Sequence, residues 1–172
     1  MATQEPQRII IDDAQKLVWW DEGVDSWNKA AERRDFDAMA PGREYYPVLK
    51  SDGAMALWKY GKEEWNEWVA SNFEADVDFS GESFSAKDGV VDFSGYRFPN
   101  GNKSFVGAKF PNADVTFHSA TFGEGDVSFF NATFGAGNIS FDDVTFGKGD
   151  VLFRSATFGS GQVGFDHAKF GA

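Results

Sequence analysis

Residues 115–172 contain a repeat with a period of twelve residues. Its units read VTFHSATFGEGD, VSFFNATFGAGN, ISFDDVTFGKGD, VLFRSATFGSGQ and VGFDHAKFGA. The two phenylalanines of a unit are five positions apart, and seven positions separate the second from the first of the next unit. A short, fixed period is typical of solenoid proteins, in which each unit packs only on its neighbours. The repeat therefore constrains the architecture before any single residue is interpreted.

Each phenylalanine of the repeat follows a valine, alanine or isoleucine by two positions. Apolar residues at i and i+2 around an intervening residue predict a very short strand with one buried face. Each unit is therefore expected to hold two such strands that point their apolar side chains inward. The phenylalanines predicted to form the core are Phe117, Phe122, Phe129, Phe134, Phe141, Phe146, Phe153 and Phe158.

Between the units lies the pattern Phe-Gly-x-Gly-Asp/Asn, for example at residues 122–126. Glycine permits positive φ, and Asp or Asn bonds its own turn backbone, so these segments are predicted to form corners. A coil of one unit has little room for two phenyl rings. We therefore expect two units, 24 residues, to complete one turn of a square tube, with successive turns about 4.8 Å apart.

The segments ATFGx and VSFFN resemble the unit of the pentapeptide-repeat family, with a two-residue insertion in every second unit. The resemblance covers residues 77–170. It implies an all-β solenoid, a right-handed quadrilateral β-helix of about four turns. It implies no single activity, because one fold hosts unrelated functions. Some family members are negatively charged rods that resemble DNA and inhibit type II topoisomerases.

The composition of the chain changes near residue 72. All six tryptophans precede it, and all but two of the 19 phenylalanines follow it. Residues 9–11 are predicted to be a short strand or a docking segment. Asp12 with Gln15 then predicts the start of a helix with Leu17, Trp20 and Trp27 on one face. A second helix is predicted after Ser51-Asp52, with Trp58, Gly61, Trp65 and Trp68 on one face.

These helices are expected to cover one end of the tube, because an open solenoid end exposes unpaired backbone groups and core side chains. Bacterial pentapeptide-repeat proteins often carry a similar Gly and Trp-Asn segment before their first turn. We therefore expect residues 1–72 to be a helical cap and residues 73–172 to be the solenoid. The tryptophans expected in the cap are Trp20, Trp27, Trp58, Trp65 and Trp68.

The first turn is less regular than the later ones. Glu82, Tyr96 and Lys103 occupy positions where later units have small apolar residues. Residues 80–90 also contain two extra residues, which predict a bulge at residues 86–89.

The composition excludes several classes of protein. Cysteine is absent, which excludes disulfides and thiol chemistry and favours a reducing compartment, so we expect a cytoplasmic protein. No apolar run approaches the roughly 18 residues of a membrane span, and no signal peptide is recognisable. The net charge is −11, with lysine and arginine scattered singly. Direct binding to nucleic acid is not expected, because it needs a basic patch.

No catalytic, cofactor or metal site is predicted. His118 and His167 are expected to face solvent, without meeting each other, a serine or a carboxylate in a nucleophilic arrangement. The Gly-x-Gly-Asp corners lack the acid spacing of calcium-binding nonapeptide repeats. No phosphate loop or HExxH motif is present. We therefore do not expect an enzyme.

Four threonines are expected to form one outward column that continues as Lys169. Threonine arrays on flat solenoid faces can bind ice, but usually as paired Thr-x-Thr, whereas the flanking residues here are apolar and inward. Exposed strand threonine is the simpler interpretation, and ice binding is kept as the second alternative. The column is Thr121, Thr133, Thr145 and Thr157.

The last unit is expected to expose an edge that can pair with another chain. Its predicted interaction residues are Phe165, His167, Lys169 and Phe170. The predicted function is a non-enzymatic scaffold that contacts an unknown protein partner or assembles with itself. A DNA-mimic inhibitor of a type II topoisomerase is the first alternative. It is weakened because residues 71–172 carry 13 acidic against seven basic residues, and because four turns span only about 20 Å.

Overall fold

The computed structural model describes residues 10–11, 17–18 and 48–171. The chain forms two compact units, Met1–Pro47 and Val48–Ala172. In the first unit, β1 (Ile10–Ile11) pairs antiparallel with β2 (Leu17–Val18). The strand expected at residues 9–11 is thus found at two of its positions. Leu17, expected on a helical face, lies in a strand instead, where its β-branched neighbour and partners favour pairing. The rest of that predicted helix, with Trp20 and Trp27, lies outside the described residues.

The second unit begins with β3 (Val48–Lys50), followed by α2 (Ser51–Tyr60) and α3 (Lys62–Ser71). The single helix predicted here is therefore wrong. The chain breaks at Gly61, whose φ of 129° is left-handed backbone that a helix does not contain. Each helix buries one apolar face, with Leu57 buried in α2 and Trp65 in α3.

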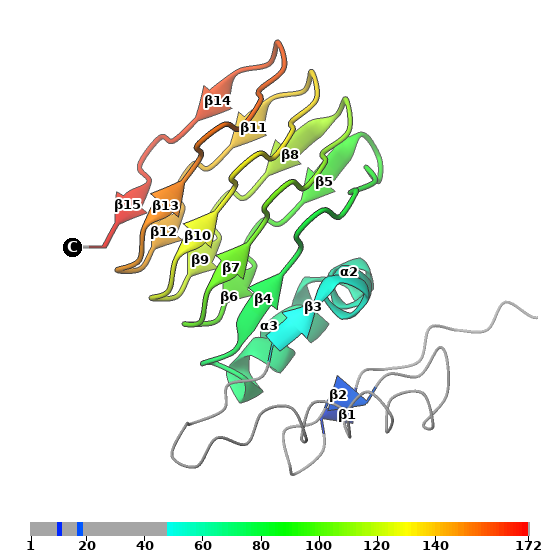
Figure 1. Cartoon of the computed structure of the whole chain (residues 1–172), viewed down its shortest axis with the longest axis vertical. Helices are drawn as coiled ribbons and strands as arrows, with labels where there is room; N and C mark the ends of the chain where they lie inside the picture. Colours follow the sequence, from blue (N-terminus) through cyan, green and yellow to red (C-terminus); the bar gives the residue numbers. More distant parts are fainter. Residues whose placement is uncertain (1–9, 12–16, 19–47, 172) are drawn as a thin grey trace, which may run out of the picture. The chain divides into compact units, whose positions relative to one another are not determined.

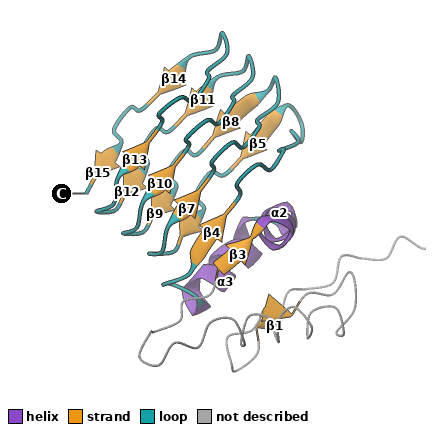
Figure 2. Ribbon diagram, in the orientation of Figure 1, coloured by secondary structure: helices purple, strands orange, loops and turns teal. Residues whose placement is uncertain are grey.

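Twelve short strands follow the helices, and they form three parallel sheets together with β3 (Figures 1 and 2). The sheet orders are β13-β10-β7-β4-β3, β14-β11-β8-β5 and β15-β12-β9-β6. The strands are β4 (Asp76–Asp78), β5 (Val90–Asp92), β6 (Arg97–Phe98), β7 (Lys103–Ser104), β8 (Asp114–Thr116), β9 (Thr121–Phe122), β10 (Val127–Ser128), β11 (Ile139–Ser140), β12 (Thr145–Phe146), β13 (Val151–Leu152), β14 (Val163–Gly164) and β15 (Lys169–Phe170).

Most paired positions are 24 residues apart: Val127 pairs with Val151, and Ile139 pairs with Val163. Isolated bridges join Lys109 to Thr133 and Thr133 to Thr157 with the same offset and add a fourth column of contacts. We call residues 77–102, 103–126, 127–150 and 151–171 layers 1 to 4. Stacked parallel strands, as predicted, are confirmed, and the arrangement is compatible with a β-helix.

The offset of 24 residues separates the threonines that the sequence places in one column. Thr121 pairs with Thr145 in the sheet that contains β9 and β12. Thr133 and Thr157 belong to the isolated bridges instead. The prediction of one column of four is wrong, because alternate twelve-residue units lie on different sides of the layers. This removes the long threonine array on which the ice-binding alternative depended.

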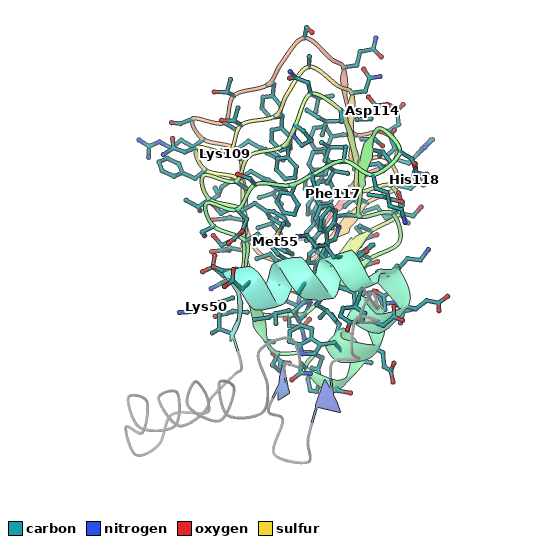
Figure 3. The ribbon with its side chains drawn as sticks, turned by 90° about the vertical axis from the view of Figure 1, so that its right-hand side faces the viewer. Lys50, Met55, Lys109, Asp114, Phe117 and His118 are labelled. Carbon is teal, nitrogen blue, oxygen red and sulfur yellow. The ribbon has the colours of Figure 1, made fainter. Side chains whose placement is uncertain are left out.

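Phenylalanine ladders fill the interior of the stacked layers. The rings of Phe117 and Phe141 are parallel within 6°, with their centroids 4.9 Å apart, which matches the spacing of paired strands. Figure 3 shows Phe117 inside the layers, and Lys109 and His118 directed outward. Six of the eight predicted core phenylalanines are buried: Phe117, Phe122, Phe129, Phe134, Phe141 and Phe146.

The other two predicted core phenylalanines lie in layer 4. Phe153 is half-buried and Phe158 is 38% exposed. Each stacks on its equivalent in layer 3, with centroids 4.9 Å and 5.1 Å apart. The exposure arises because each ring has a neighbour on one face only among the described residues.

The corner glycines are needed for close approach between layers. A Cβ on Gly123 would lie 2.5 Å from the carbonyl oxygen of Pro99, and one on Gly149 would overlap the backbone of Gly125. Positive φ occurs elsewhere, at the second residue after the first phenylalanine of a unit, for example at Asn131 and Asp143. The expectation that corner glycines supply positive φ is therefore wrong.

The corner Asp and Asn residues bond to the next layer and not to their own turn, as was expected. Asp126 Oδ1 accepts a hydrogen bond from the Asp150 N–H at 2.9 Å, and Asn138 Oδ1 accepts one from the Gln162 N–H at 3.0 Å. These side chains satisfy corner N–H groups that the strand ladders do not reach, so the corners also hold the layers together.

The two extra residues of layer 1 form a tight turn. Lys87 and Val90 exchange two backbone hydrogen bonds, of 2.9 Å and 3.0 Å. Asp88 and Gly89 between them have φ values of 52° and 85°. Positive φ at both central residues, with the sequence Asp-Gly, is the signature of a type I′ hairpin turn. The irregularity predicted at residues 86–89 is thus a two-residue hairpin turn rather than a bulge.

Candidate interaction site

The stacked layers present two different ends. At layer 1, tryptophans of α2 and α3 lie against the phenylalanine ladders. Trp65 stacks on Phe79 with ring centroids 5.8 Å apart and 14° between the ring planes, and Trp58 stacks on Phe93 at 5.5 Å. Trp68, a third predicted cap residue, is buried beside Trp65, with centroids 6.2 Å apart. Aromatic rings of the helices thus continue the ladder by one further level.

The helices also satisfy backbone groups at the edge of layer 1. Trp65 Nε1 donates a hydrogen bond to the carbonyl oxygen of Arg97 at 2.7 Å, and Trp58 Nε1 donates to that of Asp92 at 3.1 Å. Asn66 Oδ1 accepts from the Arg97 N–H at 2.8 Å, and Asn66 Nδ2 donates to the carbonyl oxygen of Gly95 at 3.2 Å. In addition β3 pairs with β4. This end is therefore already occupied by the chain itself.

Layer 4 forms the opposite end, and it is exposed. Strands β13, β14 and β15 are each the last member of their sheet. Phe165 is 38% exposed and Phe170 is 58% exposed, whereas their equivalents Phe141 and Phe146 in layer 3 are buried. Unpaired strand edges beside exposed aromatic rings form a surface on which another strand or apolar group can pack. Two of the four residues predicted at the interaction end are these phenylalanines.

The rim of layer 4 carries charges of both signs. Arg154, Asp166, His167 and Lys169 are all exposed. Arg154 and Asp166 occupy the same position in the two twelve-residue units of the layer. Because 24 residues complete one offset between paired strands, positions twelve residues apart lie on opposite sides of the layer. The rim thus has a basic corner at Arg154 and an acidic corner at Asp166.

The two histidines meet one carboxylate, contrary to the expectation from the sequence. His118 Nδ1 and His167 Nδ1 each lie 3.9 Å from a different oxygen of Asp143. The 24-residue offset is the signal that could have found this arrangement, since it places Asp143 directly below His167. The imidazoles belong to layers 2 and 4, roughly 10 Å apart along the stack. One metal ion cannot bind both, and the described residues contain no group of three or more His, Cys, Asp or Glu that could hold one.

Lys103 is a buried lysine among valines. It pairs in register with Val77 on one side and Val127 on the other. Its Nζ donates to the backbone carbonyl oxygens of Pro99, Gly123 and Gly125, at 3.2, 3.3 and 3.0 Å. Burial lowers the pKa of Lys103 from 10.5 to about 8, although the nearby carboxylates of Asp126 and Asp76 oppose the shift.

Glu82 and Tyr96 are the other two irregular residues of layer 1. Glu82 is half-buried, and Tyr96 is buried with its hydroxyl donating to the carbonyl oxygen of Trp58 at 3.3 Å. Burial, together with the charges of Asp92 and Glu64, raises the pKa of Tyr96 well above its usual value. The larger side chain of Tyr96 thus reaches the helices, which a small residue at this position would not do.

Comparisons of the chain with protein-family models, with curated proteins and with solved structures find no match. Among the helices that the structure describes, none is long and apolar enough to cross a membrane.

Proposed function

We propose that residues 73–172 form a right-handed quadrilateral β-helix of the pentapeptide-repeat type, and that the chain is a non-enzymatic scaffold acting through contact with other protein. The helical region before it acts as a cap in this proposal. Support for the fold comes from the 24-residue offset, the four columns of parallel contacts and the phenylalanine ladders. A cysteine-free chain suits a reducing compartment, so the cytoplasm of a bacterium is the proposed location.

The observation that carries this function is the difference between the two ends of the stack. Trp58, Trp65 and Asn66 engage the rings and backbone groups at layer 1. Layer 4 has the same kinds of rings and strand edges, and among the described residues nothing covers them. Fully burying a side chain such as Phe170 contributes roughly 1.5–3 kcal/mol. Contact with protein at layer 4 is therefore favourable, whichever chain supplies it.

The test compares native masses in two settings. The tagged chain is measured in extract of the cells that produce it, and then after purification. A mass above the monomer in either setting supports the scaffold function. The monomer mass in both settings overturns it.

A matched pair of variants locates the contact. Phe170→Glu places a charge in the exposed end of layer 4, and should return the mass to that of the monomer. Phe73→Glu is the control, because Phe73 is 60% exposed, close to the 58% of Phe170, but lies next to α3 and not in layer 4. Equal loss of association in both variants would contradict contact through layer 4.

A further inference from the structure

We propose that the protein that binds layer 4 is a second copy of this chain, and that the two copies meet layer 4 to layer 4 around a two-fold axis. This inference rests on the proposed function, because it needs layer 4 to be the contact surface. It adds the identity of the partner, the symmetry of the contact and the residues that select it.

The ends of the stack decide the symmetry. Head-to-tail addition would require layer 4 of one copy to pack on layer 1 of the next. Layer 1 already pairs with β3 and receives hydrogen bonds from Trp58 and Trp65. The free end can therefore meet only another free end. A contact between two identical surfaces is isologous, so it closes at two copies and does not grow into a filament.

The charges on the rim select one arrangement of the two copies. Arg154 and Asp166 lie half a turn apart on layer 4. A two-fold axis in the plane of the layer, passing through the two glycine corners, exchanges these positions. Arg154 then faces Asp166 of the second copy, and the same pair forms twice. An axis through the charged corners would instead place arginine on arginine and aspartate on aspartate, which is repulsive.

The acidic corner is larger than one residue. Asp142 lies directly below Asp166 and accepts a hydrogen bond from its N–H at 2.9 Å, and Asp143 lies beside both histidines. Three carboxylates thus lie near the guanidinium in the favoured arrangement. Below Arg154 the equivalent position is Phe130, which is uncharged and exposed. The difference between the two corners is therefore strong enough to orient the copies, and added salt should weaken the dimer by screening it.

The same axis also brings strand edges together. It places β13 opposite β15 of the second copy, running antiparallel, so that unpaired N–H and C=O groups can form ladder bonds. Phe153 and Phe170 then face the phenylalanines of the other copy. Leu152, which is 44% exposed, lies beside Lys169 of the second copy, whose aliphatic stem can cover it.

Charge reversal with exchange tests this proposal. The full chain and the variants Arg154→Asp, Asp166→Arg and the double exchange are compared by light scattering over a concentration series at low salt. We expect a dimer of fixed mass for the unmodified chain. Each single variant should raise the dimer dissociation constant by on the order of tenfold or more, and the double variant should restore it. Lys148→Asp is the control, since Lys148 makes the same change of charge in layer 3, paired with Glu124 at 3.9 Å, and should have no effect.

The outcomes separate this inference from the proposed function. A purified monomer that is nevertheless part of a larger complex in cell extract overturns the second copy as partner and leaves the scaffold function standing. Mass that grows beyond two copies overturns the two-fold contact. A double variant as weak as the single variants, with its circular dichroism and melting temperature unchanged, overturns the pairing of Arg154 with Asp166.

Discussion

Replacing Lys103 by valine should stabilise the protein near neutral pH, by an amount that shrinks as the pH rises. The change places a third valine between Val77 and Val127, whose environments in neighbouring layers already accept valine. It removes a buried ammonium group. Replacing buried charge by a well-packed apolar side chain is often neutral or stabilising by about 1–4 kcal/mol. The loss of three hydrogen bonds to carbonyl groups offsets part of the gain.

The pH dependence follows from the lowered pKa of Lys103. The unfolded chain holds the lysine proton up to about pH 10.5, whereas the folded protein releases it near pH 8. Between these values the unfolded state binds more protons, so the free energy of unfolding rises with pH. The gap corresponds to about 3 kcal/mol. The Lys103→Val variant lacks this rise, so the parent should approach or overtake it at high pH. Tyr96 is present in both proteins, and its contribution cancels in the difference.

The assay is denaturant unfolding at a series of pH values from 7 to about 10.5. The quantity compared is the difference in the free energy of unfolding between the parent and the variant at each pH. Lys109→Val is the control, because Lys109 is exposed in the same layer and should give a difference that does not change with pH. A difference for Lys103→Val that is equally constant would refute the lowered pKa and the burial that causes it.

Three further substitutions test the packing between layers. Phe141→Ala should lower the free energy of unfolding by about 3–5 kcal/mol, because it leaves a cavity in the ladder; the exposed Phe158→Ala should cost clearly less, and equal losses in denaturant unfolding would contradict the ladder. Gly149→Ala would overlap the backbone of Gly125 and should cost about 1–3 kcal/mol, with a melting temperature equal to the parent's as the contrary result. Asn66→Ala breaks two hydrogen bonds to layer 1 and should cost about 1–3 kcal/mol; hydrogen exchange should speed up at the Arg97 amide, and unchanged exchange there would contradict the contact.

The stacked strands and the phenylalanine core could be predicted because the twelve-residue period carries them directly. An apolar residue two positions before each phenylalanine leaves one inward face, and Phe117 to Phe146 lie where this pattern places them. The same argument does not reach the end of the stack. Exposure of Phe158 depends on what covers layer 4, and no pattern within the repeat records it.

Contacts between distant units could not be read from the period alone. The sequence shows a repeat of twelve, but pairing occurs at 24, so the column shared by Asp143 and His167 is visible only once the offset is applied. Corner glycines illustrate a second limit. Their role depends on the distance between successive layers at the corner, as for Gly149 above Gly125, and local turn chemistry suggests positive φ instead. The three carbonyl partners of Lys103 depend on the same interlayer geometry.

The offset of 24 residues is tested most directly by pairs of pyrene-labelled cysteines, because the chain has no cysteine of its own. Thr121→Cys with Thr145→Cys places two labels on paired positions of adjacent layers. Thr121→Cys with Thr133→Cys places them one twelve-residue unit apart, on different sides of the stack. Strong excimer emission is expected from the first pair and none from the second in dilute, monomeric protein. Excimer emission from the second pair, and its absence from the first, would contradict a stack with 24 residues in each layer.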